Sequence, residues 1–124
     1  MTLLSVILSN IAIMARPALF NLYFAGAAIP VGFVFAIFIA LGKNSSNMLL
    51  NRLSRAYIYF FRGSPFFIQL FAFYSLTLAF NESLWKPLGL DAFILHPLFL
   101  GPAILAFNTT AYTAEIFYGA LITV

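Results

Sequence analysis

The sequence predicts an all-α integral membrane protein with three transmembrane helices, at about residues 18–41, 64–81 and 97–116. Hydrophobic residues make up 64% of the 124 residues and charged residues only 7%, which is far from the composition of soluble globular domains. Three long stretches without Asp, Glu, Lys or Arg supply the helices. Such a short chain has little room for a domain outside the membrane, so lipid or partner subunits must cover its apolar surface.

The first 15 residues carry no charge, and a helix over them would have two faces. The polar side chains on one stripe are Thr2, Ser5, Ser9 and Arg16, and apolar side chains occupy the other. This pattern favours an amphipathic surface helix over residues 2–15 that lies along the membrane. An extension of the first transmembrane helix is the alternative. A cleaved signal peptide fits less well, because a basic n-region is missing.

The clearest transmembrane segment covers residues 17–42, which contain no charged residue between Arg16 and Lys43. Small residues recur at every fourth position along it, namely Ala28, Gly32, Ala36 and Ala40. Such a stripe lets another helix approach closely, so it should face protein and not lipid. Pro30 should bend this helix.

Residues 43–62 form the predicted cytoplasmic loop. Four of the six Lys and Arg residues fall within it and no acid does, and positive charge gathers on the cytoplasmic side of membrane proteins. Residues 44–47 form a capping cluster, after which apolar residues follow at helical spacing with Arg52 and Arg55 off that face. This predicts a surface helix whose basic residues anchor it to the membrane. The N-terminus is then outside.

A charged hinge separates this helix from the second transmembrane segment. Arg62 and Gly63 end the surface helix. Ser64 is a good N-cap, and Pro65 suits the first turn of a new helix. The pattern predicts that the second transmembrane helix begins at Ser64, within the uncharged residues 63–81.

Residues 82–96 form the predicted periplasmic loop, in which Trp85 is placed as an interfacial anchor. Glu82, Asp91 and His96 match no metal-ligand spacing, and a mobile polar loop explains them as well. We therefore expect no metal site.

The third transmembrane helix starts near Pro97 and becomes polar toward its end. Asn108, Tyr112 and Glu115 share one face, at positions i, i+4 and i+7. The helix runs inward, so Glu115 reaches the depth at which the second helix begins. Because an unpaired charge at that depth is costly, we expect Arg62 and Glu115 to pair.

Two blocks of this sequence resemble one known family. RxYIxxFRGSPxxxQL, over residues 55–70, and NTTAYTAEIFYGAL, over residues 108–121, are similar to the permease subunits of polar amino-acid ABC importers. The likeness extends over roughly residues 20–124 and looks closest to the histidine, basic amino-acid and opine branch. It implies that residues 1–124 form a single transmembrane permease domain, the N-terminal part of a five-helix core that is incomplete at its C-terminus.

The resemblance also implies a function. The chain would be a subunit of an ATP-driven importer in the bacterial inner membrane, and would admit polar amino acids by alternating access. Its partners would be a second permease subunit, a separate ATP-binding subunit, an extracytoplasmic solute-binding protein and the lipid bilayer, without nucleic acid. The chain lacks a GxxxxGK[ST] loop, so we expect it to be no enzyme and to bind no cofactor, with ATP used by the partner subunit.

A truncated relative without transport activity, acting as an assembly partner or relic, is the alternative function. It follows from the position of Val124, since members of the family continue with a cytoplasmic loop that docks on the ATPase and with two further helices. An ATPase partner would make most of its contacts beyond this residue.

Two amides are the best candidates for contact with an amino acid, Gln69 and Asn108, because each lies on a membrane helix near the cytoplasmic surface. Thr109 and Tyr112 complete the candidate solute path. The alternative is that these side chains only hold helices together, the commoner role of polar groups in membrane helices. The residues expected to form a gate or hinge are Arg62, Gly63, Ser64, Pro65 and Glu115.

Overall fold

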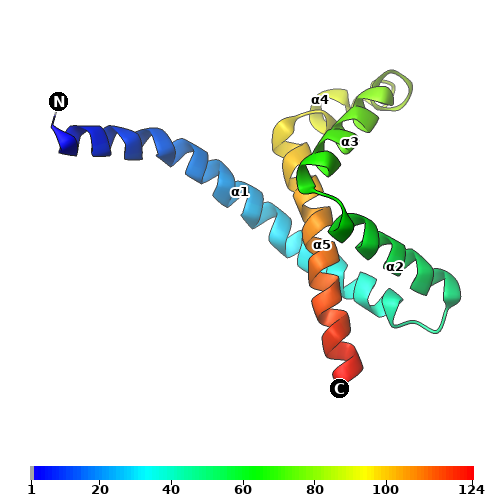
Figure 1. Cartoon of the computed structure of the whole chain (residues 1–124). Coiled ribbons are helices and arrows are strands. Elements are labelled where there is room, and N and C mark those ends of the chain that lie inside the picture. Colours follow the sequence, from blue (N-terminus) through cyan, green and yellow to red (C-terminus); the bar gives the residue numbers. More distant parts are fainter. Residues whose placement is uncertain (1) are drawn as a thin grey trace.

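The computed structural model describes residues 2–124, and its regular elements in that range are all helices. A long curved helix, α1 (Leu3–Lys43), is crossed near its C-terminal half by α5 (Pro97–Thr123) (Figure 1). The helix α2 (Met48–Gly63) folds back beside the end of α1, while α3 (Phe66–Ala79) and α4 (Asp91–Ile94) lie near the start of α5. The prediction of an all-α protein is confirmed.

The helix α1 is continuous over 41 residues, a length of about 60 Å at 1.5 Å per residue. Pro17 and Pro30 both lie inside it, and the helix curves in Figure 1 as proline-containing helices do. The sequence favours a separate helix over residues 2–15, but the structure joins residues 3–15 to the first predicted transmembrane segment. This agrees with the alternative of an extended first helix. The position of these residues relative to a membrane stays a prediction.

The small-residue stripe of α1 packs against the rest of the protein, as predicted. Its members Ala28, Gly32, Ala36 and Ala40 are all buried. A Cβ atom added to Gly32 would lie 3.0 Å from Cβ of Thr109 and 3.1 Å from the carbonyl oxygen of Ala106. Side chains of Ile58 from α2 and Ala114 from α5 complete the core beside Ala36. The absence of a side chain at Gly32 therefore sets how closely α1 and α5 approach.

The helix α2 begins as its sequence predicts. Asn47 caps it, because Oδ1 of this residue accepts hydrogen bonds from the N–H groups of Leu49 and Leu50, at 3.0 and 3.4 Å. The side chains that α2 buries are Ser54, Ile58 and Phe61. Arg52 and Arg55 are exposed, so α2 is the amphipathic helix that the spacing predicts.

The predicted capping role of Ser64 is wrong. The helix α3 begins at Phe66, with Pro65 at its N-cap and no side-chain cap. The hydroxyl of Ser64 donates a hydrogen bond back to the carbonyl oxygen of Phe60, at 2.7 Å. Carbonyl groups in the last turn of a helix have no partner within that helix, so this serine satisfies the end of α2 and not the start of α3.

The helices differ in whether their length and composition would let them cross a membrane. Among the described residues, α1 is the only helix both long and apolar enough to cross a membrane. The helix α3 is apolar but has only 14 residues, about 21 Å against a hydrocarbon core of about 30 Å. The helix α5 has 27 residues, but the polar residues between 108 and 115 lower its hydropathy. The predicted count of three spans stays a prediction.

The segment between α3 and α5 is folded and is not an open loop. A π-helix, Asn81–Trp85, follows α3, and the indole N–H of Trp85 donates to the carbonyl oxygen of Thr77 at 3.0 Å. Lys86 forms an ion pair with Glu82. Nδ1 of His96 accepts a hydrogen bond from the N–H of Leu98, at 3.1 Å, and so caps α5. No cluster of three or more potential metal ligands occurs within residues 2–124.

Candidate functional site

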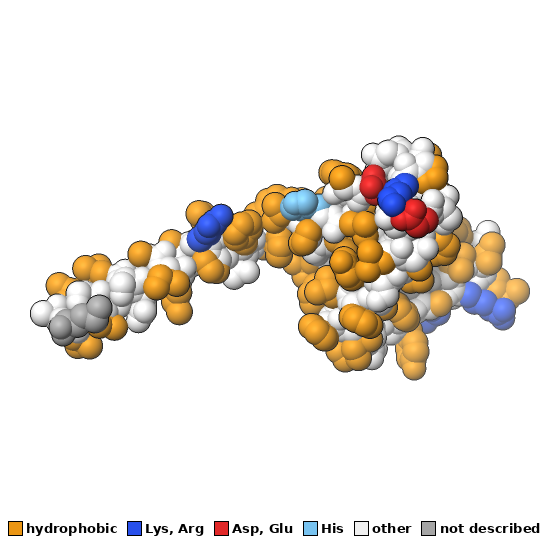
Figure 2. Space-filling model, turned by 90° about the horizontal axis from the view of Figure 1, so that it is seen from above, with side chains coloured by type: hydrophobic (Ala, Val, Ile, Leu, Met, Phe, Trp, Pro, Cys, Tyr) orange, Lys and Arg blue, Asp and Glu red, His pale blue; other side chains and the backbone are white. Residues whose placement is uncertain are grey.

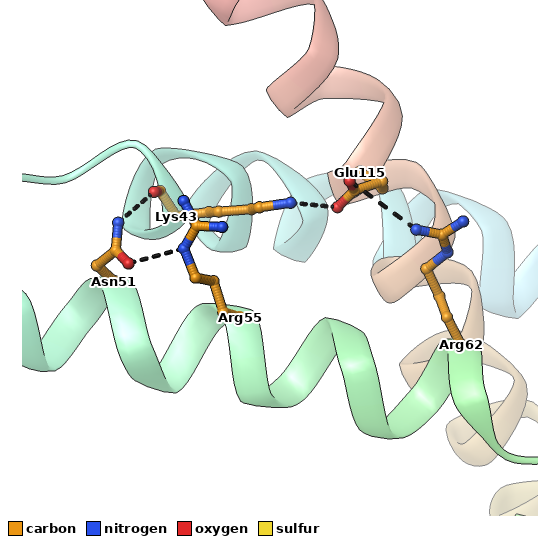
Figure 3. Close-up of polar contacts among 5 residues, drawn as sticks. All are labelled: Lys43, Asn51, Arg55, Arg62 and Glu115. Atoms are coloured by element: carbon orange, nitrogen blue, oxygen red, sulfur yellow. Dashed lines mark hydrogen bonds and ion pairs between the residues drawn. The ribbon is translucent and has the colours of Figure 1, made fainter.

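A carboxylate from α5 lies between two cations where α1, α2 and α5 meet. Oε2 of Glu115 is 2.6 Å from Nζ of Lys43, at the end of α1, and Oε1 is 3.9 Å from Nη1 of Arg62, at the end of α2 (Figure 3). The expected pair between Arg62 and Glu115 is therefore present. The closer partner is Lys43, which the sequence pattern marks only as a basic residue of the predicted cytoplasmic loop. This cluster joins three helices.

The surroundings of Lys43 explain why it needs an anion. Only 8% of this residue is exposed, and its ammonium group lies 4.2 Å from the centroid of the Tyr118 ring, where a cation is attracted by the aromatic face. Arg62 lies over Tyr112 in the same way, at 5.5 Å. A buried cation without a counter-charge is costly, so Glu115 stabilises the end of α1 in its packed position.

Asn51 extends the cluster along α2. Its Nδ2 donates a hydrogen bond to the carbonyl oxygen of Lys43, at 2.7 Å, and its Oδ1 accepts one from Nε of Arg55, at 2.8 Å (Figure 3). Lys43, at the end of α1, is thus held through its backbone carbonyl by Asn51 and through its side chain by Glu115. The sequence carried one signal for Lys43, which follows three residues after Ala40 on the buried stripe of α1.

Two amides form a second polar site, one turn inside α3. Gln69 is 1% exposed, and its Nε2 lies 2.8 Å from the carbonyl oxygen of Phe61 and 2.9 Å from that of Ser64, to which it donates. Its Oε1 accepts a hydrogen bond from Nδ2 of Asn108, at 3.0 Å. The structure therefore brings the two predicted amides together, and they tie the hinge between α2 and α3 to α5.

Aromatic rings pack beside this amide pair. Phe61, Phe73 and Phe107 stack with ring centroids 5.9 to 6.0 Å apart.

The hydroxyl of Tyr57 donates a hydrogen bond to the carbonyl oxygen of Phe107, at 2.6 Å. Burial raises the pKa of Tyr57 to about 12, so this hydroxyl stays protonated and keeps donating at any physiological pH.

Comparison with curated proteins identifies relatives of this chain. It is 34% identical over 91 residues to the nopaline transport system permease protein of Agrobacterium fabrum, covering 73% of this chain and 37% of that protein. It is 37% identical over 94 residues to the histidine/lysine/arginine/ornithine transport system permease protein of Escherichia coli K12, covering 76% and 39%. This chain is a homologue of the amino-acid transport permeases. The predicted resemblance to amino-acid transport permeases is confirmed.

A third relative widens the range of solutes among these permeases. This chain is 33% identical over 97 residues to the L-cystine transport system permease protein of Bacillus subtilis. The aligned region covers 77% of this chain and 38% of that protein. The chain thus spans about two fifths of the length of the curated relatives it matches. These relatives are transport proteins by name and not enzymes. No protein-family profile and no solved structure matches the chain.

The four residues predicted to line a solute path in this permease homologue differ in exposure. Gln69 is buried, and Thr109 packs beside Gly32 of α1. Asn108 is partly exposed and Tyr112 is 47% exposed. Of the predicted gate residues, Ser64 contacts the amide pair directly, because its carbonyl oxygen and hydroxyl lie within 2.9 Å of Gln69 Nε2.

Proposed function

We propose that this chain forms part of the membrane-spanning permease subunit of an ATP-driven importer for polar amino acids. The observation that carries this proposal is similarity to three amino-acid transport permeases over about three quarters of the chain. The all-helical, apolar fold supports it. The relatives' names include basic amino acids, an opine and cystine, which favours a polar amino acid or a derivative as the solute.

The proposed topology has three spans in a bacterial inner membrane, at about residues 18–41, 64–81 and 97–116, with the N-terminus outside. Residues 43–62 then face the cytoplasm and residues 82–96 face the periplasm. The basic residues concentrated in the first of these loops support this orientation. The helix α3 would form most of the second span, and the π-helix that follows it would begin the periplasmic segment.

Several partners belong to the proposal. A second permease subunit, a separate ATP-binding subunit and an extracytoplasmic solute-binding protein would complete the importer, and ATP would be used by the ATP-binding subunit. Hydrophobic side chains cover much of the surface, including the arm of α1 that projects from the rest of the molecule (Figure 2). Lipid and further membrane helices would cover this surface in the assembled importer.

Within the importer, we place Asn108 and Tyr112 at the solute path, with Gln69 and Thr109 behind them. Asn108 is the more accessible member of the amide pair, and Gln69 fixes its orientation through the 3.0 Å hydrogen bond. The hinge at residues 62–65 and the carboxylate of Glu115 would form the cytoplasmic gate. Movement of the hinge relative to α5 would then alter both the amide pair and the ion pair between Arg62 and Glu115.

Uptake measurements test this function. Deletion of the gene from its host should abolish or reduce uptake of at least one labelled polar amino acid, such as arginine, histidine or cystine, and the intact gene should restore it. Unchanged uptake of every polar amino acid and opine tested, with the protein shown to be in the membrane of the parent strain, would contradict the proposal.

A further inference from the structure

An open cleft lies beside the charge cluster, at the proposed cytoplasmic surface. It has a volume of about 620 Å³. Its charged lining residues are Lys43, Arg55, Arg62 and Glu115, and its other lining residues are Ala56, Ile58, Tyr59 and Gly63. The cleft thus combines three cations and one anion with an apolar wall contributed by α2.

The two arginines of the cleft keep hydrogen-bond donors to spare. Glu115 is engaged by Lys43 at 2.6 Å, and its distance of 3.9 Å from Arg62 is too long for a hydrogen bond. Arg55 uses Nε to donate to Asn51, and within residues 2–124 its terminal nitrogens make no hydrogen bond. Two guanidinium groups therefore face the cleft with free N–H groups, which bind phosphate or carboxylate oxygens well.

The arrangement of these groups along α2 suits an amphipathic ligand. Arg55 and Arg62 are seven residues apart, about two helical turns or roughly 10 Å. Tyr59 lies between them on the same face and is 82% exposed. Phe60, next to it, is 53% exposed. A ligand with an anionic head and a hydrocarbon body would contact both the arginines and this apolar surface, whereas a small soluble anion would use only the arginines.

We propose that this cleft binds the headgroup of an anionic phospholipid from the cytoplasmic leaflet. The guanidinium groups of Arg55 and Arg62 bind its phosphate oxygens, and Tyr59 lies against the glycerol and upper acyl region. Anionic lipids of the cytoplasmic leaflet attract basic residues that lie close to the membrane surface. The inference rests on the membrane placement of the proposed function but not on which solute is carried.

The test compares two arginines on one helix. Arg55→Gln removes a cation that lines the cleft. Arg52→Gln removes a cation one turn earlier on α2, which is also exposed but does not line the cleft. The protein is purified in mild detergent with the subunits that accompany it, and co-purifying phosphatidylglycerol is measured by native mass spectrometry. Retention should fall roughly tenfold in Arg55→Gln, because losing one charge-assisted hydrogen bond to the lipid phosphate costs about that factor. It should stay near the parent value in Arg52→Gln.

Three results would overturn the inference. Equal loss of phosphatidylglycerol from both variants would indicate diffuse attraction to the surface. Unchanged lipid retention in Arg55→Gln would show that Arg55 does not bind the lipid. If soluble glycerol phosphate displaces the lipid and stabilises the protein equally against heat, the site recognises a free phosphate. Arg55→Lys, which keeps the charge but loses the planar fork, should retain more lipid than Arg55→Gln. Lipid retention is measured independently of amino-acid uptake, so a failure of this test would contradict this inference without contradicting the proposed transport function.

Discussion

Glu115 is the single anion on which two cations depend, and its removal is the first prediction. Glu115→Gln should lower the free energy of unfolding by about 2–3 kcal/mol, because Lys43 would remain buried without a counter-charge. The value lies below that for fully buried pairs, since the Glu115 side chain is 33% exposed. Denaturant unfolding in detergent measures it. Glu82→Gln is the control and should change little, because its pair with Lys86 lies on the surface.

Exchange of charges should distinguish the two partners of Glu115. Lys43→Glu combined with Glu115→Lys should recover stability lost in each single variant, because the 2.6 Å pair can form in reverse. Arg62→Glu combined with Glu115→Arg should recover less, since two cations would then meet at Lys43. Thermal unfolding of all four single variants and both doubles gives the coupling energies. Greater recovery in the Arg62 double would make Arg62 the principal partner.

Gln69 provides a prediction that separates packing from solute contact. Gln69→Leu should lower the free energy of unfolding by about 1–3 kcal/mol, because the amide of Asn108 and two hinge carbonyl groups would lose a buried partner. Thermal unfolding and the yield of assembled complex measure the loss. If stability and assembly are unchanged while the apparent affinity for the transported amino acid falls, Gln69 contacts the solute directly.

The sequence identified both amides, since a Gln and an Asn stand out in apolar helices, but it could not identify their bond to each other. That bond depends on how α3 meets α5 in space. Lys43 was missed for a related reason. A lysine at the start of a basic loop is expected to mark the cytoplasmic side of the membrane. Only the crossing of α1 with α5 brings Lys43 to Glu115.

The close approach of α1 and α5 predicts that helix packing is sensitive at one glycine. Gly32→Ala should destabilise the protein by about 1–3 kcal/mol, because the new Cβ would lie 3.0 Å from Thr109 and 3.1 Å from a backbone oxygen that cannot rotate away. Gly26→Ala is the matched control in the same helix, where a Cβ meets nothing within 4 Å. Thermal unfolding compares the two, and equal melting temperatures would show that α5 can shift without cost.

Some helix boundaries could be predicted from local sequence and others could not. The stripe of α1 and the Asn47 cap of α2 follow from local spacing, which the final fold does not override. Ser64 lies between two helices, and its hydroxyl can serve the end of one or the start of the next, so local sequence cannot choose. The continuity of α1 through Pro17 was also not predictable, because a proline can either end or only bend a helix.

At the scale of the whole molecule, composition determines the class of protein more firmly than the number of spans. The apolar content excludes a soluble domain. Crossing a membrane also requires length, and α3 alone is short while α5 has a polar segment facing its neighbours. Which of these surfaces meet lipid depends on partner helices, and a single chain's sequence does not contain their positions.

The proposed topology can be tested directly because the chain contains no cysteine. Single cysteines are introduced at two exposed serines, one in each proposed loop, as Ser46→Cys and Ser83→Cys. A membrane-impermeant maleimide added to intact cells with a permeable outer membrane should label the Ser83→Cys protein. The Ser46→Cys protein should be labelled only after lysis, because positive charge holds its loop in the cytoplasm. The opposite pattern would invert the topology, and labelling of both in intact cells would mean that α3 does not carry the chain across.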